Sequence, residues 1–376
     1  MKLQRTSVSA FYFVNGFIHA NWTSRLPELR AILGATHSDL GSLLFAMACG
    51  AVIAMPFTGG LTVRLGSKKI CQLTGIVLCC ATMVIALQAN LYFEALIFFV
   101  IGLATGAMDV AMNEQAVLVE RASKKPIMSS FHAFWSLGMA VGAGSGAWFS
   151  KLGIPLPGHI LLIGVLAMTS FLIASSRLIK VNAEPSQNHP STFIIPSKVI
   201  VPLGFIAFCS MLSEGAMIDW SAIYVNEVVG SSLTLSAISF GVFGFAMTVG
   251  RFLGDYLSFK LGKKKLLVTD AILALVGLSM FLLFPTVPIT TIGLFLVGFG
   301  LSTVVPIIYS TAGNTPGVAP GVGIAMATTI GYSGFFIGPP AIGYVGDHYG
   351  LRVALIFALA LLAVMLVLIS RQKFAA

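Results

Sequence analysis

The chain has 376 residues, of which 57% are apolar and only 9% are charged, and its formal net charge is +9. Soluble domains carry about 25% charged residues, so these charges are too few to cover the surface of a soluble globule of this length. Lipid is therefore the expected solvent for most of the molecular surface.

Twelve apolar segments follow one another along the chain, and each is long enough to cross a bilayer as a helix. A spanning helix needs about 20 mainly apolar residues. A β-barrel would instead show alternating segments of about 10 residues, which are shorter than these runs. The predicted helices are 7–25, 38–62, 70–90, 94–118, 127–149, 156–176, 199–225, 234–257, 266–284, 288–311, 321–346 and 352–370. The sequence therefore predicts an all-α polytopic membrane protein with 12 transmembrane helices.

The chain also repeats itself at a fixed distance. Gly66 and Gly262 lie in similar basic turns, 262 − 66 = 196 residues apart, and the same distance separates Gly102 from Gly298. Two parallel copies of one unit in an apolar chain are typical of a secondary transporter whose site lies between the halves.

The repeat predicts two pseudo-symmetric six-helix bundles joined by a linker. We place the N-terminal bundle at 1–177, a cytoplasmic linker at 178–198 and the C-terminal bundle at 199–376. The linker is polar and contains Pro185 and Pro190, which are typical of a connection rather than of a spanning helix.

The basic residues are distributed unevenly between the two sides of the predicted membrane. With the N-terminus in the cytoplasm, 18 of the 22 Lys and Arg residues fall inside, and Arg25, Arg30, Lys151 and Arg352 fall outside. This asymmetry predicts that both termini are cytoplasmic. It also explains the positive net charge as a matter of topology, so we expect no nucleic-acid partner.

The sequence shows no motif for a metal, a nucleotide or covalent catalysis. No cysteine pair has CxxC spacing, and no HExxH, Gly-x-Ser-x-Gly or phosphate-binding loop is present. We therefore expect no metal, no cofactor and no enzymatic activity. Without an ATP site, transport must be driven by a gradient.

Residues 59–69, Gly-Gly-Leu-Thr-Val-Arg-Leu-Gly-Ser-Lys-Lys, resemble the signature loop between helices 2 and 3 of the major facilitator superfamily. That loop reads roughly Gly-x-Leu-Ala-Asp-Arg-x-Gly-Arg-Lys, and Val63 takes the place of its aspartate. We predict a cytoplasmic gate at this loop and at related positions, namely Gly59, Arg64, Gly66, Lys68, Glu120, Arg121, Arg251 and Asp255.

Further stretches are similar to the YbjJ/MosC-like branch of that superfamily, which consists of bacterial inner-membrane proteins. They are residues 21–27, 109–113, 119–121, 132–138, 214–216, 219–220, 250–252 and 338–340. The resemblance implies the fold of the superfamily, with helices 1, 4, 7 and 10 around a central cavity. It also implies a multi-pass protein of the bacterial cytoplasmic membrane.

Asp109 is the first candidate for a proton carrier. It lies near the middle of segment 94–118, where a charged side chain costs at least about 2.5–3.5 kcal/mol. Loss of water around a carboxylate favours its protonated form, which makes proton exchange feasible. Asn113 follows at i+4 and shares its helix face. The alternative is a structural carboxylate held by a neighbouring helix.

Glu214, near the middle of segment 199–225, is the second candidate for proton coupling. Intramembrane acids of this kind mark transport pathways or pair with other residues. The sequence leaves both roles open for Glu214.

Segment 7–25 carries Asn15, His19 and Trp22 on one helix face. An amide, an imidazole and an indole can bind hydroxyl groups and stack on a sugar ring, but they can also hold helices together. The other candidates for substrate binding are Asn113, Trp220, Tyr309 and Tyr332.

These observations predict a secondary transporter that works by alternating access, couples to protons and moves a small polar solute such as a sugar or polyol. We expect a monomer whose partners are the solute, protons and the lipid bilayer. The alternatives are a proton-driven exporter of amphipathic or drug-like compounds and, ranked lower, a membrane-embedded sensor or enzyme.

Overall fold

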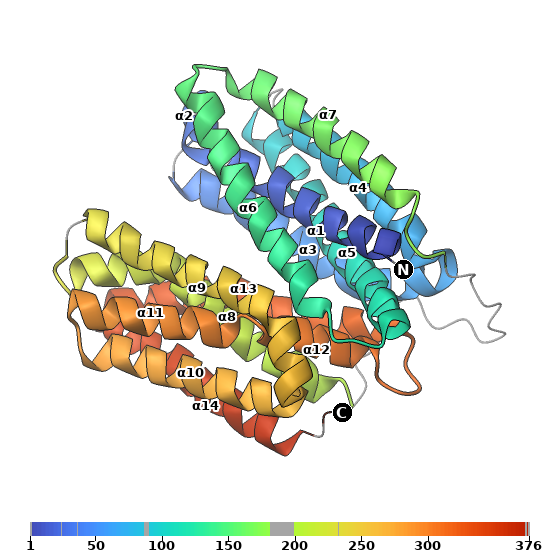
Figure 1. Ribbon diagram of the computed structural model, residues 1–376. Helices are drawn as coiled ribbons and strands as arrows, with labels where there is room; N and C mark the ends of the chain where they lie inside the picture. The colour runs from blue at the N-terminus through green and yellow to red at the C-terminus, as the bar shows by residue number, and fades with distance from the viewer. Residues whose placement is uncertain are drawn as a thin grey trace. The chain divides into compact units, whose positions relative to one another are not determined.

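The computed structural model describes residues 2–23, 25–35, 37–85, 90–180, 199–231, 233–372 and 374 (Figure 1). Within these residues the chain forms fourteen helices and no strand. In the first half they are α1 (Lys2–Thr23), α2 (Leu26–Leu33), α3 (His37–Leu65), α4 (Ser67–Val84), α5 (Leu91–Ser123), α6 (Met128–Lys151) and α7 (Leu156–Ser175). In the second half they are α8 (Val201–Glu227), α9 (Leu233–Leu261), α10 (Lys263–Leu283), α11 (Val287–Leu301), α12 (Val304–Gly313), α13 (Pro320–Tyr349) and α14 (Leu351–Arg371).

Each predicted segment corresponds to helical structure, with two differences. Segment 288–311 is divided into α11 and α12, with a turn at residues 302–303. The short helix α2 was not predicted, because its eight residues are far too few to cross a bilayer. The predicted linker, 178–198, lies outside the described residues from 181 onward.

Helix ends differ from the predicted bounds because hydropathy marks the apolar stretch, whereas capping contacts set the ends of the helix. Helix α5 shows this clearly, since it is longer than the predicted segment 94–118. Its N-cap is Asn90, whose side chain accepts a hydrogen bond from the Phe93 amide, and its C-cap is Lys124 with φ 52°. An Asn N-cap satisfies a backbone donor that the helix itself leaves open.

Nine helical segments of the described residues are long and apolar enough to cross a membrane. Among them, α11 and α12 count together as one segment, Val287–Gly313. Length and composition therefore agree with a polytopic helical protein.

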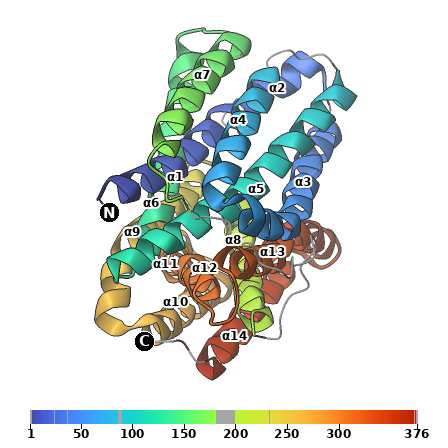
Figure 2. The same cartoon turned by 90° about the vertical axis from the view of Figure 1, so that its right-hand side faces the viewer.

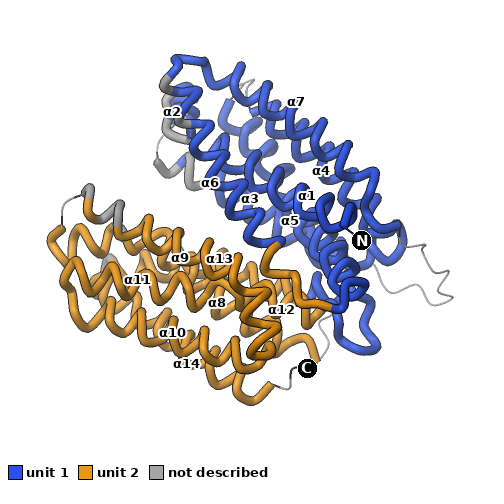
Figure 3. The backbone as a smooth tube through the Cα atoms, in the orientation of Figure 1, with its two compact units in different colours: residues 1–124, 131–195, 313–326 blue, residues 125–130, 196–312, 327–376 orange. Residues whose placement is uncertain are grey.

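The chain divides into two compact units (Figure 3). Unit 1 comprises Met1–Lys124, Phe131–Ile195 and Gly313–Met326, and unit 2 comprises Lys125–Ser130, Pro196–Ala312 and Ala327–Ala376. Each unit thus includes one short segment from the other half of the sequence. The division into bundles at 1–177 and 199–376 stays a prediction from the repeat.

Inside each unit, glycine allows two helices to approach closely. Helices α3 and α5 run side by side in unit 1 (Figures 1 and 2), and a Cβ on Gly102 would collide with the Met47 carbonyl oxygen. In unit 2, a Cβ on Gly298 of α11 would collide with the Phe243 carbonyl oxygen of α9. Close backbone approach at small residues is how membrane helices gain packing energy without a hydrophobic driving force.

The tight turns between consecutive helices also repeat. Gly66 precedes α4 with φ 80° and ψ 139°, and Gly262 precedes α10 with φ 78° and ψ 151°. Both lie in a region of backbone conformation that only glycine adopts readily. The 196-residue repeat found in the sequence therefore reappears as repeated backbone geometry.

Candidate functional site

Six polar side chains from three helices of unit 1 form two hydrogen-bonded sets, one around Asn113 and one that joins Asn15 to Trp135, and we call them together the polar cluster. Its members are Tyr12 and Asn15 of α1, Asp109 and Asn113 of α5, and His132 and Trp135 of α6. Sequence reasoning selected Asn15, Asp109 and Asn113 of this group but did not predict which helices supply their partners.

Asn113 lies at the centre of the polar cluster and is fully buried. Its Nδ2 donates to Asp109 Oδ1 at 3.2 Å and to the Asp109 carbonyl at 2.8 Å. Its Oδ1 accepts from the Tyr12 hydroxyl at 2.7 Å and lies 3.2 Å from His132 Nε2. The amide therefore connects the buried carboxyl group to a phenol and an imidazole.

Asn15 makes the second connection in the cluster, between α1 and α6. Its Oδ1 accepts a hydrogen bond from the Trp135 indole at 3.0 Å, and its Nδ2 lies 3.2 Å from the Met108 sulfur. A neighbouring aromatic contact fixes Tyr12, whose ring centroid lies 5.2 Å from that of His132 in an edge-on arrangement. The cluster thus combines hydrogen-bonding groups with aromatic faces.

This arrangement can recognise a polar solute and exchange a proton. Donors and acceptors set among apolar and aromatic groups are typical of small-molecule sites. Asp109 is 7% exposed. A carboxyl group so deep in a membrane helix is a functional candidate by default.

The remaining candidates on α1 pack mainly against rings. His19 lies edge-on to Trp22 with centroids 5.0 Å apart, and Trp22 lies edge-on to Phe98 of α5 at 5.2 Å. Trp22 is 2% exposed, and its indole nitrogen has no hydrogen-bond partner among the described residues. The sequence grouped Asn15, His19 and Trp22 as one stripe, whereas the structure gives Asn15 different contacts from the other two.

In unit 2, Glu214 of α8 forms a buried ion pair with Arg251 of α9 at 3.3 Å. The predictions had assigned Glu214 to proton coupling and Arg251 to the gate, and the structure brings the two together. Ser210 and Ser213, on the same helix as Glu214, have buried hydroxyls without a hydrogen-bond partner in the described part of the chain. Unsatisfied buried hydroxyls are rare and call for an explanation.

The three aromatic candidates of unit 2 come from three different helices, α8, α12 and α13. Tyr309 of α12 is buried, with its hydroxyl 3.7 Å from the Met211 sulfur. Tyr332 of α13 lies edge-on to Phe335 with centroids 6.0 Å apart. Trp220 of α8 has a buried indole nitrogen that finds no hydrogen-bond partner among the described residues.

Two predicted gate residues of unit 1, Arg121 and Lys68, donate hydrogen bonds to loop residues and to helix ends. Arg121 donates to the Asn314 side chain and to the Gly313 carbonyl, both at 2.5 Å. Lys68 donates to the Ser176 carbonyl at 2.9 Å. These contacts tie α5 to Gly313 and Asn314, which belong to the same unit, and tie α4 to the residue that follows α7.

The other gate candidates occupy a range of environments. Gly59 lies so close to Ala325 that an added Cβ would be only 2.7 Å from the Ala325 Cβ, and Gly66 supplies the turn before α4. Glu120 is buried and Arg64 is exposed. In unit 2, Asp255 accepts a hydrogen bond from the Ser130 amide at 3.1 Å.

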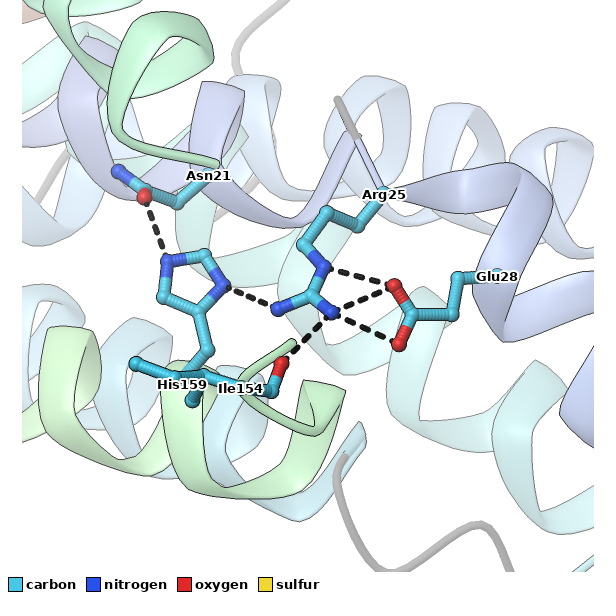
Figure 4. A network of polar contacts seen from close by, with 5 residues as sticks. All are labelled: Asn21, Arg25, Glu28, Ile154 and His159. Atoms are coloured by element: carbon cyan, nitrogen blue, oxygen red, sulfur yellow. Dashed lines mark hydrogen bonds and ion pairs between the residues drawn. The ribbon is translucent and has the colours of Figure 1, made fainter. Parts of the chain in front are cut away.

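Sequence reasoning missed a network around Arg25 in unit 1 (Figure 4). Arg25 is 4% exposed and pairs with Glu28 through Nε at 2.8 Å and through Nη2 at 2.5 and 2.7 Å. It also donates to the Ile154 carbonyl at 2.9 Å and to His159 Nδ1 at 3.2 Å, while His159 Nε2 lies 2.9 Å from Asn21 Oδ1. The network connects the end of α1 to α2 and α7. Its only sequence signal was the stretch 21–27, which contains Asn21 and Arg25.

A second missed feature is Asp270 of α10, which is 1% exposed. The Thr303 hydroxyl donates to its carboxyl group at the turn between α11 and α12. Paired in this way, Asp270 is placed to hold the interrupted helix. The sequence signal was a single acid inside segment 266–284.

Among the described residues, no group of three or more His, Cys, Asp or Glu side chains could hold a metal ion. The candidate sites themselves contain hydrogen-bonding groups, buried carboxyl groups and aromatic rings.

Comparison with known proteins identifies the family. The model of the Major Facilitator Superfamily matches residues 8–339. An uncharacterised MFS-type transporter of Yersinia pestis is 36% identical over 351 residues, which cover 93% of this chain and 91% of that protein. Membrane protein MosC of Rhizobium meliloti is 28% identical over 362 residues, with 96% and 88% covered. The chain belongs to the major facilitator superfamily, and its resemblance to the MosC-like branch is confirmed.

Solved structures show the same fold. The transporter FucP in its outward conformation matches with a TM-score of 0.81 at 16% identity, over 98% of both chains. A second structure of FucP, described as the fucose:proton symporter of E. coli, gives a TM-score of 0.79. The predicted all-α fold with 12 transmembrane helices is thereby confirmed, and the protein is a membrane transporter of this superfamily.

Proposed function

We propose that this transporter moves a small polar solute, such as a sugar or polyol, by proton-coupled alternating access. The observation that carries the proposal is the polar cluster, in which Asp109 is connected through Asn113 to Tyr12 and His132. One buried site thus offers a titratable acid together with groups that can bind hydroxyls.

The side chains of the polar cluster favour binding of a polar solute over binding of an apolar one. Phenol, imidazole and amide groups donate and accept hydrogen bonds, and the half-buried ring of Trp135 offers a flat face for a sugar ring. A site built to hydrogen-bond hydroxyl groups discriminates strongly against analogues that lack them, because its buried polar groups would be left unpaired. Likeness in fold to a fucose:proton symporter agrees with this class of solute.

Asp109 is the proposed proton carrier, and Glu214 is the second candidate. The two acids differ in surroundings, because Glu214 is paired with the cation of Arg251. We assign proton exchange first to Asp109, because its carboxyl group is hydrogen-bonded to Asn113, which also contacts Tyr12 and His132.

We further propose that the protein is a monomer in a bacterial cytoplasmic membrane with both termini in the cytoplasm. The distribution of basic residues supports this orientation. The two bundles, 1–177 and 199–376, would move against each other as the units of alternating access, with a cytoplasmic gate at the signature loop. His19, Trp22, Trp220, Tyr309 and Tyr332 remain candidates for solute contacts.

The test is a thermal-shift screen of the purified protein against sugars, polyols, organic acids and hydrophobic cations at two pH values. A compound that binds only the folded state raises its stability by mass action. We expect a sugar or polyol hit whose affinity changes with pH, and we expect Asp109→Asn to remove that change. The control Glu227→Gln, which alters an exposed carboxylate at the end of α8, should leave it intact. Stabilisation by hydrophobic cations alone would overturn the proposal in favour of the exporter.

A further inference from the structure

The turn between α9 and α10 in unit 2 carries a dense group of lysines. Lys260 ends the exposed part of α9, and Lys263, Lys264 and Lys265 open α10. Lys264 donates a hydrogen bond from Nζ to the Ser370 carbonyl at 2.8 Å, which holds the start of α10 against the end of α14. The other three lysines make no hydrogen bond or ion pair with any described residue. Their charges are therefore open to a partner outside the chain.

An exposed row of aromatic side chains leads along α9 to these lysines. Phe252, Tyr256 and Phe259 occupy the i, i+4 and i+7 positions of one helix face, and they are 45%, 60% and 68% exposed. Lys260 Nζ lies 5.8 Å from the centre of the Tyr256 ring, and a cation at this place is attracted by the ring face. The predicted span 234–257 ends beside this row. Exposed aromatic residues at such a level are typical of the boundary between membrane and water.

The corresponding turn of the first half lacks this combination. Val63 and Ser67 stand 196 residues before Phe259 and Lys263. Ser67 is fully buried, and its hydroxyl accepts a hydrogen bond from Gln115 at 3.0 Å. Both turns lie on the same side of the predicted membrane, so the preference for basic residues on the cytoplasmic side applies to both. That preference does not explain the aromatic row or the additional lysine, which only the second half carries.

We propose that Tyr256, Phe259, Lys260, Lys263 and Lys265 form a docking surface for an anionic phospholipid of the cytoplasmic leaflet. The lysines bind the phosphate of the headgroup, and the two rings lie against the upper part of the acyl chains. All five residues belong to unit 2. The inference goes beyond the proposed function and takes from it only the cytoplasmic placement of this turn.

Charge and shape of the surface together favour this occupant. A basic residue next to a membrane attracts anionic lipid by about fivefold in affinity, so three lysines together favour it by about a hundredfold. A zwitterionic lipid carries its own ammonium group, which the lysines repel. A soluble anion satisfies the lysines but gains nothing from the exposed rings of Tyr256 and Phe259. Only a lipid with an anionic headgroup uses both parts of the surface.

The first test measures lipid binding to the purified full-length protein in detergent by native mass spectrometry. The wild-type protein should retain phosphatidylglycerol more tightly than phosphatidylethanolamine, and higher salt should weaken the retention because it screens exposed charges. The triple variant Lys260→Gln/Lys263→Gln/Lys265→Gln should lose about a hundredfold in affinity for phosphatidylglycerol. Equal affinity for the two lipids in the wild-type protein, or unchanged affinity in the triple variant, would overturn the inference.

Milder variants and a matched control keep the test independent of folding. Phe259→Val and Lys263→Ser install the residues of the first half, and they should lower affinity for phosphatidylglycerol by about threefold and fivefold. The control Lys2→Gln/Lys69→Gln/Arg177→Gln removes the same total charge from exposed positions of unit 1 and should change that affinity by less than about twofold. A loss in the control as large as in the first triple variant would show that only net charge matters, which contradicts a defined surface.

The unfolding temperature without added lipid should be the same in the wild-type protein and in every variant, because all the substituted side chains except Lys263 are exposed.

The second test separates a lipid from a free anion and uses thermal unfolding in detergent. Phosphatidylglycerol should raise the unfolding temperature of the wild-type protein, because a ligand of the folded state stabilises it, and inorganic phosphate at millimolar concentration should not. Equal stabilisation by phosphate and by the lipid would show that the surface binds a free anion, and the proposal would be wrong.

Neither test involves a solute or depends on the side of the membrane. A failed sugar screen therefore leaves the lipid result standing, and a failure of lipid binding leaves the proposed function standing.

Discussion

The two halves of the molecule share a scaffold but differ in the chemistry they carry. Close contacts recur at the 196-residue spacing, since Gly102 approaches Met47 in one unit and Gly298 approaches Phe243 in the other. The glycine turns recur as well, with φ near 80° before both α4 and α10. Backbone packing has therefore kept the symmetry of the repeat.

The side chains at equivalent positions have diverged. In unit 1, Asn15 accepts a hydrogen bond from the Trp135 indole. At the equivalent positions of unit 2 stand Met211 and Gly331, and the Met211 sulfur lies next to Gly331 and to the Tyr309 hydroxyl. By the same spacing, Tyr12 corresponds to Phe208, Asp109 to Val305 and Asn113 to Tyr309. The polar cluster is thus a property of the first half, and its counterpart in the second half is largely apolar.

The second half carries its own buried charges at positions that are apolar in the first. Glu214 and Arg251 correspond by the repeat to Ile18 and Met55, which are both buried. A duplicated fold can thus keep one packing plan while each copy acquires a different polar centre. Four sets of variants test this difference between the two halves.

The largest effect is expected from removing one partner of the ion pair of unit 2. In Glu214→Ile, the buried Arg251 loses its counter-charge, and breaking a buried pair in this way costs about 3–5 kcal/mol. The double variant Glu214→Ile/Arg251→Met installs the residues of the first half and should recover much of the loss. Thermal unfolding in detergent measures both. Equal stability of the single and double variants would show that the pair is not coupled.

Next in size is the effect of filling the close helix contacts. Gly102→Ala and Gly298→Ala should each destabilise their unit by about 1–3 kcal/mol, because the added methyl meets a backbone oxygen that cannot move aside easily. The controls Gly144→Ala and Gly244→Ala have nothing within 4 Å of the new methyl. They should be neutral or stabilising in the same unfolding assay. A loss at only one of the two contacts would contradict the shared scaffold.

The glycine turns should respond equally in the two halves. Gly66→Ala and Gly262→Ala force a side chain into a positive-φ conformation, which costs roughly 1–2 kcal/mol. Unfolding temperatures of the two variants should fall by similar amounts. If only Gly66→Ala loses transport while both lose stability, the signature loop has a gating role beyond its turn.

The smallest effect on stability is expected from exchanging chemistry between the halves. Asn15→Met introduces the residue found at the equivalent position of the second half, Met211, and removes the acceptor for the Trp135 indole. The loss of this hydrogen bond should lower the free energy of unfolding by about 1 kcal/mol. It should weaken sugar or polyol binding and change Trp fluorescence. Met211→Leu is the control and should leave affinity unaltered. Unchanged affinity in Asn15→Met would place the solute away from this part of the cluster.

The sequence predicted those features that depend on local composition and spacing. Apolar segments predicted the helices, and the glycine repeat predicted the turns at Gly66 and Gly262. The partner of Asn15 could not be predicted, because Trp135 lies 120 residues away and the side chain that it meets depends on how α1 and α6 are rotated. A helix face can be predicted from a period of 3.6 residues, but its neighbour cannot.

Short helices, helix breaks and side-chain networks near turns could not be predicted from the sequence either. Helix α2 is too short for a hydropathy signal, and the break between α11 and α12 lies inside one continuous apolar stretch. Arg25 was noted only as an outside charge and as part of the stretch 21–27, although all three of its guanidinium nitrogens make contacts, with Glu28, Ile154 and His159. Such networks require the tertiary structure, since their members come from separate helices.

Whether the first half of the chain holds the proton-linked solute site can be measured by transport in proteoliposomes. Proteoliposomes containing wild-type protein, Asp109→Asn or Glu227→Gln are given a gradient of the sugar or polyol found in the screen, and the internal pH is followed. We expect a solute-dependent pH change for the wild-type protein and for Glu227→Gln, and none for Asp109→Asn. A pH change of unaltered size in Asp109→Asn would show that Asp109 does not carry the coupled proton.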